Sequence, residues 1–418
     1  MTDLHAVRGM KDILPEEAKH WQWIENQARY VFERFGYQEI RTPLLEKTEV
    51  FSRGIGDTTD IVEKEMYTLE DSKGSYISLR PEMTASVARA YVEHHLDQSN
   101  DVCRLFYIGP MFRHERPQAG RLRQFHQMGV ELIGLDQPMA DADVICLVCS
   151  LLDTLGIKGY QLRLNSLGSV DTKKEYSQAL RNYLQDKVSN LCPLCQARFQ
   201  RNVFRILDCK EEHCSEISSQ APSLLDWHSE LDKNYFEKVQ FYLTQLKIPF
   251  DVDPRMVRGL DYYTRTVFEI SHSGLGAKDA LGAGGRYDNL IHLIGGKSTG
   301  AVGFAIGIER LLMVLNLVDA MSEQKSVYLV VLGETAMLKG YHLLQELRRE
   351  DISSELNMSG KSLKSQLRQA DKKNAAWTLI CGEDEVKQSV MTVKNMKNGE
   401  SHTISDKDIM SFLKQNLK

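Results

Sequence analysis

The sequence contains no hydrophobic run long enough to cross a membrane. A membrane-spanning helix needs roughly 18 consecutive apolar residues, and no such stretch occurs among the 418 residues. The N-terminal segment MTDLHAVRGMKDILPEE has no apolar stretch behind a basic start, so it does not match a signal peptide. Lipidation signals and internal repeats are absent as well. We therefore expect a soluble, cytoplasmic protein without a membrane partner.

Cysteine is scarce, with 8 residues in the chain, which excludes a secreted fold held together by disulfides. Half of these cysteines stand singly in apolar stretches, as buried free thiols do. The others lie close together in one segment: Cys192, Cys195, Cys209 and Cys214. Their spacing is compatible with Zn²⁺, although it favours unligated thiols in a helical module. No metal ligand is therefore assigned from the spacing alone.

An excess of one charge is also missing, because 52 Lys and Arg against 57 Asp and Glu leave a formal net charge of −5. This balance excludes a chain that coats nucleic acid through its overall charge, although a local basic surface remains compatible with it. The composition, with 42% hydrophobic and 26% charged residues, is that of an ordinary globular protein. The length predicts more than one domain.

Helical and strand patterns are mixed along the chain and predict an α+β protein. We expect a helix from Pro15 to Gly36, a strand over 37–42, a helix from Glu82 and a strand over 264–271, and the stretch GFAIGIERLLMVLN has a helical pattern.

The charged, helical pattern of residues 170–230 predicts an insertion that divides one domain into residues 1–169 and 231–322. After a polar boundary at 322–325, the buried-strand patterns VYLVVLG and AAWTLICGEDE alternate with a helical one. They predict a smaller α/β domain with parallel pairing over 326–418.

Residues 104–134 predict a long antiparallel hairpin, in which RLFYIGPMFRHE and RQFHQMGVELIG flank the link RPQAGRL. Alternate residues of a strand share a face, so Phe125, Gln127, Gly129 and Glu131 point one way and apolar residues the other. Phe125 and Glu131 would lie about 20 Å apart, a span that suits an elongated ligand. Gly129 would let that ligand lie against the backbone.

The link between the two strands is locally basic. Residues 113–123 contain four arginines and a single acidic residue. Guanidinium groups form bidentate, charge-assisted bonds with phosphates. The hairpin therefore predicts a phosphate-binding loop next to a polar strand face.

These stretches resemble the signatures of class II aminoacyl-tRNA synthetases. FRHERP with RQFHQMGVELIG is similar to the second signature, GFAIGIERL to the third, and YQEIRTPLLE around Pro43 to the first. The stretches VRGLDYYT and GGRYD resemble histidyl-tRNA synthetases specifically, and LRPEMT resembles their amino-acid-binding segment, with Met83 where glycine is common.

The resemblance implies a catalytic domain with an antiparallel β-sheet flanked by helices, a helical insertion and a C-terminal α/β anticodon-binding domain. It further implies a homodimer that activates L-histidine with ATP and Mg²⁺ and transfers the histidine to the 3′ end of tRNA(His).

The resemblance and the residue types together suggest a role for each site residue. Catalysis would depend on Arg258, Arg113 and Gln127, with Arg258 in place of a metal cation at the α-phosphate. The histidine-binding residues would be Glu82, Thr84, Gln127, Glu131, Arg258, Tyr262 and Tyr263. The ATP-binding residues would be Arg113, Glu115, Arg121, Phe125 and Arg310. The acceptor end of the tRNA would meet Arg116, Gln118 and Arg123.

Recognition of imidazole needs a partner at both ring nitrogens, and the carboxylate of Glu131 with the phenol of Tyr263 would supply them. Two local alternatives remain: Arg258 could form an ion pair with Asp261, and Tyr262 and Tyr287 could serve packing alone.

In the C-terminal domain a basic stretch suits the anticodon stem, although such a stretch is commonly only a solvated face. It contains Lys361, Lys364, Arg368, Lys372 and Lys373. Two rival functions remain open, of which only the second would share every one of these residues. One is a non-catalytic relative that regulates a phosphoribosyltransferase, which would be expected to lack the ATP-binding arginines and the C-terminal domain. The other is an RNA-binding regulator without turnover.

Overall fold

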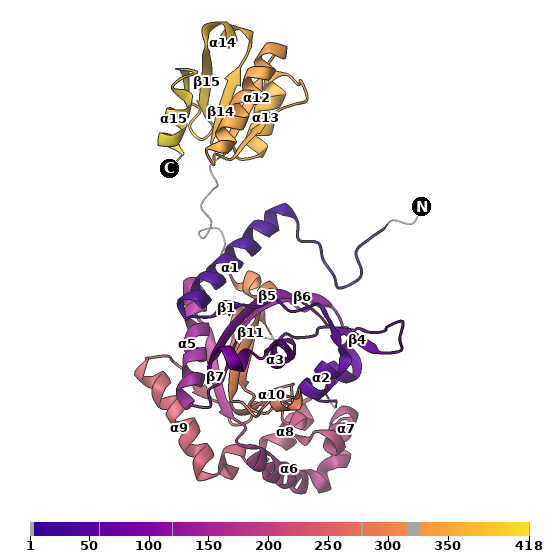
Figure 1. Ribbon diagram of the computed structural model, residues 1–418. Helices are drawn as coiled ribbons and strands as arrows, with labels where there is room; N and C mark the ends of the chain where they lie inside the picture. Colours follow the sequence, from indigo (N-terminus) through magenta and orange to yellow (C-terminus); the bar gives the residue numbers. More distant parts are fainter. Residues whose placement is uncertain (1–3, 58, 119, 277–278, 316–325, 418) are drawn as a thin grey trace. The chain divides into compact units, whose positions relative to one another are not determined.

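The computed structural model describes residues 4–57, 59–118, 120–276, 279–315 and 326–417. The chain forms two compact units, Met1–Val318 and Asp319–Lys418 (Figure 1). The polar boundary expected at 322–325 lies outside the described residues. Over the described ranges, no helix combines the length and the apolar character that a membrane crossing requires.

The first unit is built around a sheet of eight strands. From edge to edge they are β1 (Gln38–Glu39), β5 (Cys103–Phe112), β6 (Gln124–Ile133), β11 (Ala301–Gly307), β10 (Ala280–Arg286), β9 (Thr264–Ser271), β7 (Gln161–Ser166) and β8 (Asp251–Val252). The strands from β5 to β7 pair antiparallel, and β1 and β8 add short parallel edges. The predicted hairpin, the strand over 264–271 and the antiparallel sheet are confirmed.

Helices cover both faces of this sheet and create two buried cores. The first core contains α1 (Pro15–Arg34), α5 (Pro138–Thr154), α9 (Glu230–Gln245) and α11 (Ile308–Val314). The second core contains α3 (Thr84–Glu93) and the helical insertion. In Figure 1 the arc of β5, β6 and β11 curves around α3. Side chains on the α3 face of the sheet are therefore enclosed between the strands and α3.

Shorter elements complete the first unit, most of them around α3. They are α2 (Thr48–Ile55), the π-helical turn η1 (Ile61–Glu65), α4 (Leu96–Ser99), η5 (Ser273–Leu275), α10 (Leu290–Leu293) and a small sheet of β2 (Leu45–Lys47), β4 (Tyr76–Leu79) and β3 (Thr68–Glu70). Of these, η5 packs against α11. Helix α2 packs against both α3 and α10. These contacts fix the segment that begins α3.

Two predicted elements are shorter than expected. The strand over 37–42 is reduced to β1, although the Ile40 amide still donates to the Phe106 carbonyl. The helix expected from Glu82 begins at Thr84, because the Glu82 carboxylate accepts from the Thr84 and Ala85 amides and so caps the helix from outside. The helix at Pro15 is confirmed, with Glu16 and Glu17 in its first turn and its end before Gly36.

The helical interpretation of GFAIGIERLLMVLN is wrong in its first part. Residues 303–307 belong to β11, which pairs with β6 on one side and β10 on the other, and α11 begins only at Ile308. A short apolar run in a central strand cannot be distinguished from a buried helix by periodicity. Pairing with distant strands decides its conformation.

The insertion is helical, as predicted. It contains α6 (Val170–Leu184), η2 (Gln185–Asn190), α7 (Pro193–Arg201), η3 (Val203–Ile206), α8 (Glu212–Ser219) and η4 (Leu224–Trp227). The Ser169 hydroxyl accepts from the Thr172 amide and begins α6. Its buried side chains continue the core on the α3 face of the sheet.

The second unit is a small α/β domain. Its strands are β13 (Ser354–Leu356), β12 (Val327–Val331), β14 (Trp377–Cys381), β15 (Val390–Asn395) and β16 (Ser401–Ser405), in this spatial order. Its helices are α12 (Glu334–Arg349), α13 (Leu363–Lys372), α14 (Glu383–Gln388) and α15 (Ile409–Asn416). The predicted parallel pairing holds for β13, β12 and β14, whereas β15 and β16 add antiparallel strands.

Candidate active site

Glu131 is a buried carboxyl on the α3 face of β6, with 1% of its surface exposed. Its Oε1 accepts from the Thr84 hydroxyl at 2.7 Å and from the Tyr107 hydroxyl at 3.4 Å, and its Oε2 accepts from the Tyr287 hydroxyl. Burial raises the pKa of Glu131 to about 8, although the bonds from Tyr287 and Thr84 oppose that rise. Three neutral donors thus hold a carboxyl that no cation neutralises within this set of contacts.

Small residues on the neighbouring strands leave room beside Glu131. Across the sheet, Ala283 and Gly285 of β10 are paired with Ala305 and Gly303 of β11 and share their face with Glu131. A Cβ atom at Gly303 would collide with the Glu131 carboxylate, and one at Gly285 would lie 2.9 Å from the Tyr263 ring. The glycine-rich stretches therefore form a strand floor on which larger side chains converge.

Gly129 does not have the role expected from the sequence. A Cβ atom there would lie 2.5 Å from the Tyr107 hydroxyl, because Tyr107 faces Gly129 across the β5–β6 pair. The free space is therefore used by a tyrosine of the same sheet rather than left for a ligand. Tyr107 is a site residue that the sequence analysis missed.

The start of α3 brings Glu82 and Thr84 next to Glu131. Both residues are buried, and the Glu82 oxygens accept from the Thr84 amide at 2.9 Å and the Ala85 amide at 2.8 Å. Burial raises the pKa of Glu82. Glu82 caps the helix, and each of its oxygens retains a further lone pair for a donor.

Gln127 lies on the same face of β6 as Glu131. Its Oε1 is buried and has no hydrogen-bond partner among the described residues. A buried acceptor without a partner is unfavourable unless a ligand supplies the missing donor. Gln127 therefore fits the predicted binding of an amino group.

Arg258 lies in the segment before β9 and pairs with a residue that the sequence did not indicate. Its Nη1 donates to Glu269 Oε2 at 2.6 Å, and Arg163 lies 3.4 Å from the other oxygen of Glu269. The Nε of Arg258 is buried and finds no acceptor in the described part of the chain. Asp261, the partner considered from sequence, instead accepts from the Asn202 side chain at 2.7 Å.

Tyrosines form the wall that adjoins this arginine. The ring centroids of Tyr262 and Tyr263 are 4.7 Å apart, and those of Tyr262 and Tyr287 are 5.7 Å apart. Burial raises the pKa of Tyr263 to about 12, and the charge of Arg258 acts in the opposite direction. Tyr287 is not merely a packing residue, because it donates to Glu131. In the sequence, the only indication of this role was that Tyr287 lies in the stretch GGRYD.

The predicted ATP-binding residues lie together at the other end of β6. The Arg113 guanidinium stands 5.3 Å from the centre of the Phe125 ring, and Arg121 donates to Glu115 at 3.0 Å. The Nε of Arg310 donates to the Gly120 carbonyl at 3.3 Å. Burial lowers the pKa of Arg310, and the charge of Arg121 lowers it further. The cationic side chain of Arg310, from α11, thus lies close to Arg121 of the hairpin loop.

The three residues expected at the acceptor end of tRNA differ in their placement. Arg116 and Gln118 are exposed on the hairpin loop. Arg123 is half-buried, its Nε donates to the Glu115 carbonyl at 3.2 Å and its amide donates to the Gly9 carbonyl at 2.7 Å. Arg123 thus stabilises the loop, whereas the side chains of Arg116 and Gln118 are accessible to a ligand.

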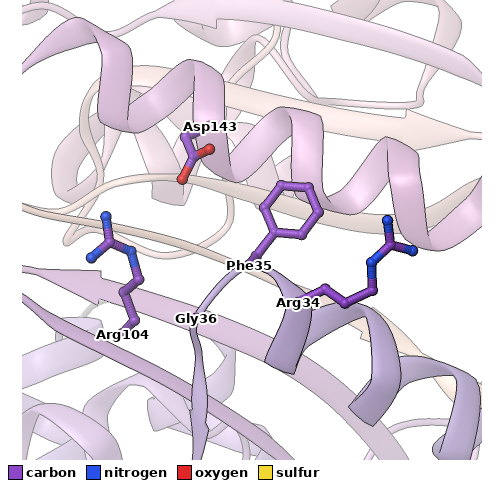
Figure 2. A pocket seen from close by; sticks show the side chains of 5 residues that line it. All are labelled: Arg34, Phe35, Gly36, Arg104 and Asp143. Atoms are coloured by element: carbon purple, nitrogen blue, oxygen red, sulfur yellow. The ribbon is translucent and has the colours of Figure 1, made fainter.

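A separate pocket lies at the end of α1 and is lined by Arg34, Phe35, Gly36, Arg104 and Asp143 (Figure 2). Arg104 pairs with Leu132, which belongs to the core on the opposite face of the sheet from Glu131. This pocket is therefore distinct from the site formed by Glu131, Arg258 and Arg113.

Comparison with known proteins gives matches for both units. A family model described as histidyl-tRNA synthetase matches residues 9–311, and one described as an anticodon-binding domain matches residues 326–416. The histidine–tRNA ligase of Halalkalibacterium halodurans is 48% identical over 99% of this chain and 98% of that protein. That of Halothermothrix orenii is 48% identical over 95% and 96%. The crystal structure of apo histidyl-tRNA synthetase from S. aureus has a TM-score of 0.83 at 35% identity, with 99% of this chain and 100% of that chain covered.

Proposed function

The chain belongs to the histidyl-tRNA synthetase family, and from this premise we propose how its own side chains divide the work of the reaction. The reaction activates L-histidine with ATP and transfers the histidine to the 3′ end of tRNA(His). One observation carries the assignment: β6 presents a buried carboxyl, Glu131, at one end of a face and an arginine-stacked phenyl ring, Phe125, at the other. An amino acid and a nucleotide would lie along the same strand.

The histidine side chain would bind between Glu131 and Tyr263. A carboxylate accepts from one ring N–H, and a phenol can donate to or accept from the second nitrogen. The α-amino group would donate to the unpartnered Oε1 of Gln127, with Glu82 and Thr84 beside it. An analogue that lacked one ring nitrogen would leave a buried group unpaired, which gives strong discrimination.

The α-phosphate of ATP would lie between Arg258 and Arg113. A carboxylate oxygen of histidine attacks the α-phosphorus, a new P–O bond forms, and the bond to the leaving pyrophosphate breaks. Arg258 from the histidine side and Arg113 from the adenine side would stabilise the charge that develops on the α-phosphate oxygens. Glu269 is a positioning residue, because it holds Arg258 in place.

Magnesium would arrive with ATP. The His114 amide donates to the Glu65 carbonyl at 2.6 Å, so Glu65 lies beside the segment that carries Glu115, the acceptor of Arg121. Burial and the charge of Glu115 raise the pKa of Glu65. Carboxylate oxygens are ligands that Mg²⁺ accepts, and the ion would neutralise the phosphate charge when it is bound. Arg121 and Arg310 would bind the β- and γ-phosphates.

Exposed basic side chains would bind the tRNA. Arg116 and Gln118 would meet the acceptor end. In the second unit, Lys364, Arg368 and Lys372 are exposed and follow a four-residue spacing along α13, so they share one helix face.

We propose that two copies of the chain form a homodimer. The exposed Leu44 and Leu45, next to Pro43 in the first signature, support this proposal, because exposed apolar side chains are suited to an interface.

The decisive test is histidine-dependent exchange of pyrophosphate into ATP. We expect exchange with histidine and none with the other amino acids. We expect the Arg258→Ala protein to bind histidine but to form the adenylate slower by orders of magnitude, whereas Arg255→Ala, at an exposed position three residues away, should retain the rate. A folded dimer without exchange would favour a non-catalytic relative, against which the retained Arg113, Arg258 and Arg310 and the second unit argue.

A further inference from the structure

The four clustered cysteines converge in the helical insertion. Cys192 immediately precedes α7 and Cys195 lies in its first turn, while Cys209 follows η3 and Cys214 belongs to α8. Their four Sγ atoms all lie within 4.8 Å of one another. Cys195 and Cys214 are fully buried. Residues separated by up to two helices thus present their sulfur atoms to one point.

The distances fit a shared metal ion better than a disulfide. The Sγ atoms of Cys192 and Cys209 are 3.9 Å apart. Zn–S bonds of about 2.3 Å in a tetrahedron place sulfur atoms about 3.8 Å apart, whereas a disulfide requires about 2.05 Å. The Cys192 amide also donates to Cys214 Sγ at 3.2 Å. An amide donor of this kind favours a thiolate, which is the form that binds metal.

We propose that Cys192, Cys195, Cys209 and Cys214 bind one structural Zn²⁺ ion. Four thiolates complete a tetrahedral shell and leave no position for water or substrate, so the site is structural rather than catalytic. The ion crosslinks α7, η3 and α8 within a small module. The neighbouring His213 is exposed and stands outside the group of sulfur atoms.

The module that the ion crosslinks touches the segments around the histidine site. From α7 and η3, Arg198 and Arg205 lie 3.4 and 3.0 Å from Asp60, and Asn202 donates to Asp261 at 2.7 Å. Asp261 directly precedes the two tyrosines of the site. The ion therefore stabilises the insertion and, through it, the position of the segment that carries Tyr262 and Tyr263.

The first experiment measures metal in the full-length protein purified under reducing conditions. We expect one zinc ion per chain by elemental analysis, and after exchange with Co²⁺ we expect the thiolate-to-cobalt and d–d absorption of a tetrahedral sulfur site. All 8 cysteines should titrate as thiols after denaturation. Less than about 0.1 zinc per chain after incubation with Zn²⁺, iron in place of zinc, or a disulfide within the cluster would each overturn the proposal.

A variant and its control locate the site. Cys195→Ser should lose the zinc and the cobalt spectrum, whereas Cys146→Ser, a substitution of a half-buried thiol in α5, should keep both. Should Cys195→Ser fail to fold, removal of zinc from the unaltered protein by a chelator replaces it. Hydrogen exchange should then speed up at least tenfold in residues 192–214 and also in 257–263, and added Zn²⁺ should reverse both changes. Unchanged exchange in 192–214 after complete removal would refute a structural role.

Discussion

Replacement of Glu131 by glutamine tests the centre of the site, because it removes the ionisable carboxyl and nearly preserves the shape. Of the hydroxyls of Thr84, Tyr107 and Tyr287, those at the retained oxygen can still donate to it, and those at the new NH2 group can rotate and accept from it. The fold should therefore survive. Histidine, however, would lose the carboxylate that Glu131 supplies as an acceptor for a ring N–H above its pKa of about 8.

The expected size of the effect follows from that single bond. A hydrogen bond to a charged group contributes about 1.5–3 kcal/mol, which corresponds to about 10- to 150-fold in affinity. In pyrophosphate exchange above pH 8, where Glu131 is ionised, the KM for histidine should rise by this factor and the KM for ATP should not change. Glu46→Gln is the matched control, since Glu46 is also buried in the first unit but pairs with Arg89.

The same variant tests the consequence of burial for stability. The pKa of Glu131 is about 8 in the folded protein against 4.5 in the ordinary state. Between these pH values the folded protein holds a proton that the unfolded chain has lost, so the unfolding free energy falls as the pH rises. The fall is on the order of 4–5 kcal/mol and should be absent from Glu131→Gln.

Urea denaturation between pH 5 and pH 8 measures this difference. The variant should gain stability relative to the unaltered protein as the pH increases, and the two should approach each other near pH 4.5. Parallel curves would refute the argument from burial. An unchanged KM for histidine would remove Glu131 from imidazole binding, whatever the denaturation shows.

Three further substitutions test other parts of the molecule. Phe125→Leu should raise the KM for ATP by about 5- to 150-fold through lost stacking on the adenine, and an equal rise in the KM for histidine would contradict that role. Arg286→Met should cost about 3–5 kcal/mol of stability in urea denaturation, because it leaves a fully buried aspartate without its partner; a loss below 1 kcal/mol would be evidence against it. Changing Lys364, Arg368 and Lys372 together to glutamine should raise the KM for tRNA at least tenfold and weaken its salt dependence without an effect on pyrophosphate exchange, and an unchanged KM would show that this face of α13 is merely solvated.

Local patterns in the sequence determined several parts of the site. The alternation in β6 placed Gln127 and Glu131 on the face opposite the apolar residues, because side chains in a strand alternate strictly. The arginines of the hairpin loop were predicted from the local composition, and the contact of Arg113 with Phe125 follows from the short distance along the chain. The family resemblance added Arg258 and Arg310, which lie far from the hairpin in sequence.

Tertiary structure decided what depends on neighbours from distant segments. The order of strands in the sheet brings Glu269 to Arg258. It also brings the hydroxyls of Tyr107 and Tyr287 to Glu131. The glycines of β11 lay in a stretch with a helical pattern, because the side chains that require their small size come from other strands.

The cysteine cluster shows the same division between sequence and structure. Spacing left both zinc and unligated thiols open and favoured the thiols, because the distance along a chain does not fix the distance in space. The packing of α7, η3 and α8 brought the four sulfur atoms within 4.8 Å of one another. The sequence thus determined which chemical groups are present and which share a strand face, and the three-dimensional packing determined which of them meet.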